Sequence, residues 1–166
     1  MMRVMSQAAR GMTALGVFAL VTLFAHVDAR AESGAVDCAI FEIKASNVGE
    51  GIDKELKPLQ KKLSKGPFKA WKRFQKLAIH NKKLAHMRAA EAKLVPGKLS
   101  VLYKGTIQVK GRKDRVRLSL TIDDKGGKRV IDTGTEQDSG DYFLIVDGRL
   151  RISGGDYILA LSCVAK

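Results

Sequence analysis

The chain has 166 residues, of which 30 are Lys or Arg and 17 are Asp or Glu, giving a formal net charge of +13. Its two cysteines lie far apart and no His-x-x-x-His pair accompanies them, which argues against a tetrahedral zinc site. Neither a Gly-x-Ser-x-Gly elbow nor a phosphate-binding glycine loop occurs, so no motif names an enzyme activity.

The first 31 residues have the layout of a secretory signal peptide. Arg3 and Arg10 precede an apolar run over 12–25, and small residues at Ala29 and Ala31 form an Ala-x-Ala site. The run of about 14 residues is short for a membrane-spanning helix, which needs roughly 20, and a retained anchor is the alternative. We therefore predict cleavage after Ala31 and a secreted or periplasmic product, with a bacterial envelope as the favoured location.

Residues 32–166 are enough for one domain with a hydrophobic core and too few to expect two. In an oxidising compartment Cys38 and Cys163 are expected to form a disulfide, which would tie the first strand to the last. Free buried thiols and an intermolecular bond are the alternatives.

The first element in chain order is a strand over 36–45, with apolar residues on both of its faces. A basic helical segment is predicted over 53–94, with two to three helices. Ile52, Leu56, Leu59 and Leu63 form one apolar stripe, interrupted by Pro58.

A second helix is predicted to begin at Pro67, with an apolar face of Phe68, Trp71, Phe74 and Leu77. These aromatic residues are interpreted as core, and an exposed stacking or membrane-inserting platform is the alternative. Residues 84–94 fit either a helix or a strand, and the helix is favoured slightly because of the alanines.

Residues 98–164 are predicted to form an antiparallel β meander, either one curved sheet or a small sandwich. The clearest strand is 116–122, in which apolar and polar residues alternate. Asp147-Gly148 is typical of a tight hairpin turn, and the last strand covers 157–164. The predicted fold class is thus α+β, with the first strand beside the last.

The excess positive charge lies in one segment. Between Lys54 and Arg88 there are twelve Lys or Arg and one acidic residue, Glu55. A block this dense creates a positive field over part of the surface and favours an anionic partner, although solubilising charge is the alternative. The candidate ligand-binding residues are Lys57, Lys61, Lys62, Lys65, Lys69, Lys72, Arg73, Lys76, Lys82 and Lys83.

Catalytic candidates are weak. His80 and His86 are six residues apart, lack a His-Glu-x-x-His pattern and are interpreted as surface histidines. Asp138, Asp141, Asp147 and Asp156 lie beside Ser or Gly in predicted turns, where their side chains bond to the local backbone.

The sequence predicts a non-enzymatic binding module without cofactor or metal. Its basic helical face would engage an anionic envelope component or an acidic protein, with nucleic acid less favoured. The alternative is a structural or inhibitory protein interaction domain that uses a sheet edge or loops.

Overall fold

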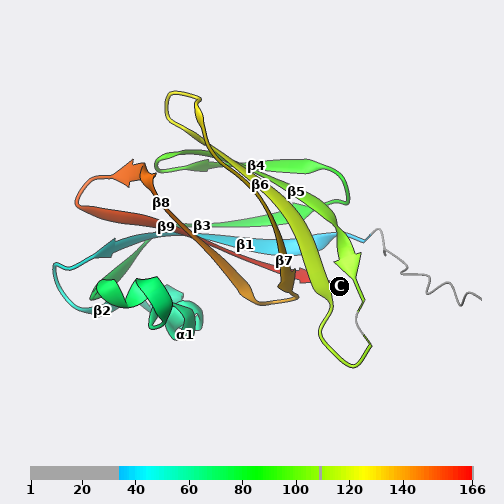
Figure 1. Ribbon diagram of the computed structural model, residues 1–166, viewed down its shortest axis with the longest axis horizontal. Coiled ribbons are helices and arrows are strands. Elements are labelled where there is room, and N and C mark those ends of the chain that lie inside the picture. Colours follow the sequence, from blue (N-terminus) through cyan, green and yellow to red (C-terminus); the bar gives the residue numbers. More distant parts are fainter. Residues whose placement is uncertain (1–33, 109, 166) are drawn as a thin grey trace, which may run out of the picture.

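The computed structural model describes residues 34–108 and 110–165, so the predicted signal peptide lies outside the described residues. Two β-sheets face each other, and a short helical segment covers part of the outer face of one of them (Figure 1). The described chain is therefore arranged in three layers.

The first sheet has five strands in the order β2-β3-β1-β9-β8 and contains both ends of the described chain. Its members are β1 (Val36–Ser46), β2 (Gly51–Ile52), β3 (Arg73–Leu84), β8 (Tyr142–Ile152) and β9 (Gly155–Ala165). The second sheet is an antiparallel meander of β4 (Ala89–Leu94), β5 (Gly97–Ile107), β6 (Arg115–Asp124) and β7 (Arg129–Asp138).

The main hydrophobic core lies between the two sheets. In β6 the residues Val116, Leu118, Leu120 and Ile122 are all buried, and the residues between them are more exposed. This alternation is the pattern that predicted the strand, because one face of β6 packs on the first sheet and the other faces solvent.

A smaller core lies on the opposite face of the first sheet. It is covered by a helical layer, residues 54–70, which consists of η1 (Lys54–Leu59), α1 (Gln60–Leu63) and η2 (Gly66–Ala70). Leu56, Leu59 and Leu63 of this layer are buried against β1 and β9. Because both of their faces are covered, β1 and β9 carry buried apolar residues on both faces.

The predicted disulfide is confirmed. Cys38 of β1 and Cys163 of β9 are register partners in adjacent antiparallel strands, with their Cα atoms 4.1 Å apart. Both residues are buried in the core between the sheets. The first strand therefore pairs with the last, as the sequence predicted.

The helical prediction for 53–94 holds only in its first part, and the fold is mostly β. One short α-helix and two 3-10 helices occupy 54–70, but β3 and β4 occupy most of the remainder. Arg73–Leu84 pairs along the whole length of β1, and this long-range pairing outweighs the helical spacing of its apolar residues. The slight preference for a helix over 84–94 was wrong, since Ala89–Leu94 pairs with β5.

Two details of the predicted meander also change. Only β4 to β7 form the meander sheet, whereas β8 and β9 belong to the first sheet. The prediction of a hairpin turn at Asp147-Gly148 was wrong, because these residues lie at a register irregularity inside β8. The Asp147 carboxylate accepts hydrogen bonds from the backbone N–H and side chain of Arg149, which lower the Asp147 pKa to about 2 and stabilise this irregular part of the strand.

Candidate functional site

Five of the ten candidate cations form an exposed group on and just after the helical layer: Lys57, Lys61, Lys65, Lys69 and Lys72. They face solvent because the leucines of the same segment face the sheet. In the described chain, no carboxylate lies within ion-pair distance of any of these five ammonium groups. We call them the unpaired lysines.

Two other candidates, Arg73 and Lys76, form ion pairs that hold the helical layer onto β3. Arg73 Nη2 lies 2.5 Å from Asp53 Oδ1, and Lys76 Nζ pairs with Glu55. The backbone N–H of Lys76 also donates to Asp53 Oδ2 at 2.9 Å, and together with Arg73 this bond lowers the pKa of Asp53. These two cations are therefore used for local structure.

Lys62 connects α1 to the beginning of β8. Its Nζ lies 2.7 Å from Asp141 Oδ2. Burial opposes ionisation of Asp141, but hydrogen bonds from Lys62 and from the Tyr142 N–H outweigh it, so the Asp141 pKa is lowered. Lys62 is thus a third candidate cation that already has a carboxylate partner.

Lys82 and Lys83 lie apart from the other candidates, at the far end of β3. At about 3.3 Å per residue, the strand carries them roughly 30 Å from Arg73. The ten predicted residues therefore do not form one continuous surface. The unpaired lysines form one group, and Lys82 and Lys83 lie apart from it.

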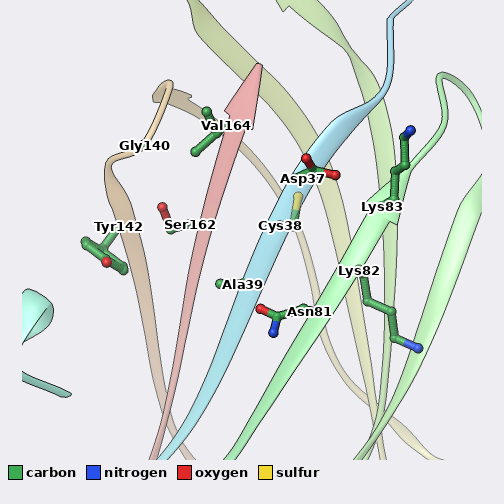
Figure 2. Close-up of a pocket in the computed structure, with 10 residues that line it drawn as sticks. All are labelled: Asp37, Cys38, Ala39, Asn81, Lys82, Lys83, Gly140, Tyr142, Ser162 and Val164. Atoms are coloured by element: carbon green, nitrogen blue, oxygen red, sulfur yellow. The ribbon is translucent and has the colours of Figure 1, made fainter. Parts of the chain in front are cut away.

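Lys82 and Lys83 border a shallow hollow of about 530 Å³ on the part of the first sheet that the helical layer does not cover. Figure 2 shows the two lysines extending from β3 on one side and Tyr142 from β8 on the other, with Ala39 and Ser162 between them. Asn81 of β3 also lines the hollow. The hollow is open, and one Asp, two Lys and neutral side chains line it.

The aromatic residues support the core interpretation. Phe74 is buried in β3, and Phe68 and Trp71 are half-buried against the smaller core. Phe68 lies in η2, Trp71 directly follows η2, and Phe74 lies in β3. Their spacing of three residues therefore does not reflect one helix. Trp71 Nε1 donates to Asp156 Oδ2 at 2.6 Å, which fixes the indole beside the β8–β9 turn.

His80 differs from the predicted solvated histidine, because its Nε2 lies 2.7 Å from Oε1 of the buried Glu42. The other carboxylate oxygen of Glu42 accepts hydrogen bonds from the Val95 N–H and the Tyr157 hydroxyl. We define Glu42, His80, Val95 and Tyr157 as the Glu42 network. No motif in the sequence predicted this network, although an acidic residue between Phe41 and Ile43 in a largely apolar strand is a signal that could have revealed it.

Both carboxylate oxygens of Glu42 have hydrogen-bond partners within the protein, which fits a structural role between the sheets. His86 is elsewhere, with Nε2 3.2 Å from the Lys104 carbonyl oxygen. Over residues 34–108 and 110–165, no group of three or more His, Cys, Asp or Glu side chains is arranged to hold a metal ion.

No helix in the described part of the chain is long and apolar enough to span a membrane. Comparison with known proteins adds no relative: no family model, curated protein or solved structure matches this chain.

Proposed function

We propose that this protein is an exported, non-enzymatic binding module whose unpaired lysines engage an anionic surface or ligand of the cell envelope. One observation carries the proposal. Arg73, Lys76 and Lys62 each have a carboxylate partner, whereas the five unpaired lysines have none among the residues that the structure describes.

This arrangement costs stability in the free protein. Like charges gathered on one short segment repel each other, and salt screens this repulsion over a Debye length of about 8 Å at physiological ionic strength. An anionic partner would relieve the repulsion and gain favourable contacts at the same place. The export part of the proposal is supported by the buried disulfide and by the leader pattern in the sequence.

The experiment measures retention on heparin and binding to phosphatidylglycerol vesicles over a series of salt concentrations. We expect binding at low salt that weakens steeply as salt increases. With duplex DNA as a test polyanion, each contacted phosphate contributes about 0.9 to the slope of log affinity against log salt. Replacing all five unpaired lysines by Glu should remove this binding without breaking an ion pair of the fold.

A matched variant carries five Lys→Glu changes on the second sheet and its loops, at Lys93, Lys104, Lys110, Lys125 and Lys128. These residues are also exposed, so the net charge changes equally. Retained binding in this variant, with loss in the first, would support the proposed surface. Equal loss in both variants would show that only total charge matters and would contradict it.

A protein interaction module remains the second candidate because of the outer edge of β3. β2 pairs only with Arg73 and Phe74, so the backbone of β3 beyond them has no strand partner on that side among the described residues. An extended peptide could add to such an edge. Capture of a protein partner that persists at high salt would favour this function, whereas salt-sensitive capture would favour the lysine surface.

A further inference from the structure

A shallow, open pocket of about 510 Å³ lies beside the helical layer, between α1, η2 and the start of β3. Its apolar wall is formed by Ile52, Leu63, Trp71 and Phe74, and two of the unpaired lysines, Lys69 and Lys72, stand at its rim. The volume lies within the range of about 300–1,000 Å³ that is usual for small-molecule sites.

The pocket continues the smaller core toward solvent. Leu63 and Phe74 are buried members of that core, while Ile52 and Trp71 are half-buried and pack against it. The hydrogen bond from Trp71 Nε1 to Asp156 Oδ2 holds the indole in place, so this wall is present before a ligand binds. An apolar group in the pocket would therefore extend an existing apolar surface.

We propose that this pocket binds the acyl chain of an anionic, single-chain lipid, with the headgroup held by Lys69 and Lys72. The inference depends on the proposed function, because the headgroup uses two of the same lysines. A polysaccharide or nucleic acid backbone would match the rim but leave the apolar wall in water. A neutral apolar ligand would match the wall but gain nothing from the two cations.

Trp71 is the only tryptophan of the chain and lies in the pocket wall, so its fluorescence reports on this site. The probes are octanoate, decanoate and dodecanoate, each below its micelle concentration. We expect a saturable blue shift of the Trp71 emission, with binding about fourfold tighter for each added methylene that enters the pocket. Dodecyltrimethylammonium, which has the same chain length and the opposite charge, should bind at least tenfold more weakly.

Two pairs of variants separate the chain site from the head site. Ile52→Glu should remove the dependence on chain length, whereas Val48→Glu, an equal charge change at an exposed loop residue, should retain it. Lys69→Glu with Lys72→Glu should weaken dodecanoate binding at least tenfold, and Lys125→Glu with Lys128→Glu should not. If Ile52→Glu fails to fold, the chain-length series on the unchanged protein still tests whether the acyl chain enters the pocket.

The outcomes also separate this inference from the proposed function. If heparin and anionic vesicles bind but the fatty acid series leaves Trp71 emission unchanged, the lipid pocket is refuted and the lysine surface stands. Chain-length-dependent binding without heparin or vesicle binding would support the pocket and refute the broader surface. Equal binding of dodecanoate and dodecyltrimethylammonium would refute the role of the two lysines at the rim.

Discussion

Tyr157 of β9 donates its hydroxyl proton to Glu42 Oε2 of β1 across 2.9 Å, in the buried space between the two sheets. The same oxygen accepts the Val95 N–H at 2.6 Å, from the turn between β4 and β5 in the other sheet. The Glu42 carboxylate therefore connects both sheets through hydrogen bonds, in addition to the apolar core. A buried carboxylate is costly unless it is fully hydrogen-bonded, so each of these donors matters.

Tyr157→Phe should lower the free energy of unfolding by about 1.5–3 kcal/mol, which is typical for a lost hydrogen bond to a charged group. The measurement is urea unfolding followed by circular dichroism. Tyr142→Phe is the matched control, because in the described chain its hydroxyl makes no hydrogen bond, and we expect a change within about 0.5 kcal/mol. Equal effects of the two substitutions would mean that the bond to Glu42 contributes nothing.

Alkaline pH should destabilise the protein partly through Tyr157. Burial, and then the charge of Glu42, raise the pKa of Tyr157, whereas in the unfolded chain it ionises near 10.0. Above pH 10 the folded state binds more protons at this site than the unfolded state. The free energy of unfolding therefore falls as pH increases, by up to about 1.4 kcal/mol per pH unit for one group.

This contribution is fully present below pH 10 and is lost above it. In Tyr157→Phe the decline of stability between pH 10 and 12 should be shallower than in the unchanged protein. The check is urea unfolding at a series of pH values, with tyrosinate absorbance as a second signal. A slope that stays the same in the variant would show that Tyr157 ionises normally in the fold.

The parts of the fold that the sequence predicted well are those in which one local pattern has one structural solution. The alternation in β6 identifies a strand with one buried face, and two cysteines in an oxidising compartment have only each other to pair with inside one chain. The helical prediction for residues 71–94 failed for the opposite reason, because the local pattern there does not determine the structure. The backbone of β3 is in a strand because β1 lies beside it, and this partner is more than 25 positions away in the sequence.

The candidate site also depends on contacts between residues that are far apart in the sequence. The local charge count found the lysines, but it could not show which of them are matched by carboxylates. Lys62 is neutralised by Asp141, 79 positions further along the chain. The apolar pocket wall likewise combines β2, α1 and β3, so its joint contact with Lys69 and Lys72 depends on the folded arrangement.

Loss of the disulfide should strongly destabilise the protein. The bond closes a loop with a sequence separation of 125 residues, for which the chain-entropy model gives up to about 5 kcal/mol, and measured losses are usually about 2–5 kcal/mol. The variant Cys38→Ala with Cys163→Ala avoids buried free thiols, and urea unfolding measures its stability. The reduced unchanged protein should unfold at a similar urea concentration, whereas full stability in the double variant would contradict a structural role for the bond.

Gly97→Ala should lower the free energy of unfolding by about 1–3 kcal/mol, because there is no space for a side chain at this position. Gly97 begins β5, and a Cβ atom there would lie 1.9 Å from the Asp123 carbonyl oxygen of β6. Relief of this clash requires movement of the β4–β5 turn, which also carries the Val95 N–H that binds Glu42. The substitution should therefore disturb the Glu42 network as well as the second sheet.

Gly134→Ala in β7 is the matched control, since a Cβ atom there would have its nearest neighbour, the Leu118 carbonyl oxygen, at an ordinary 3.8 Å. We expect this variant to be neutral or slightly more stable, by up to about 1 kcal/mol, because alanine reduces the entropy of the unfolded chain. Urea unfolding measures both stabilities, and NMR of the His80 ring reports on the Glu42 network. If Gly97→Ala left both the stability and the His80 signals unchanged, the close approach of β5 and β6 at this turn would be wrong.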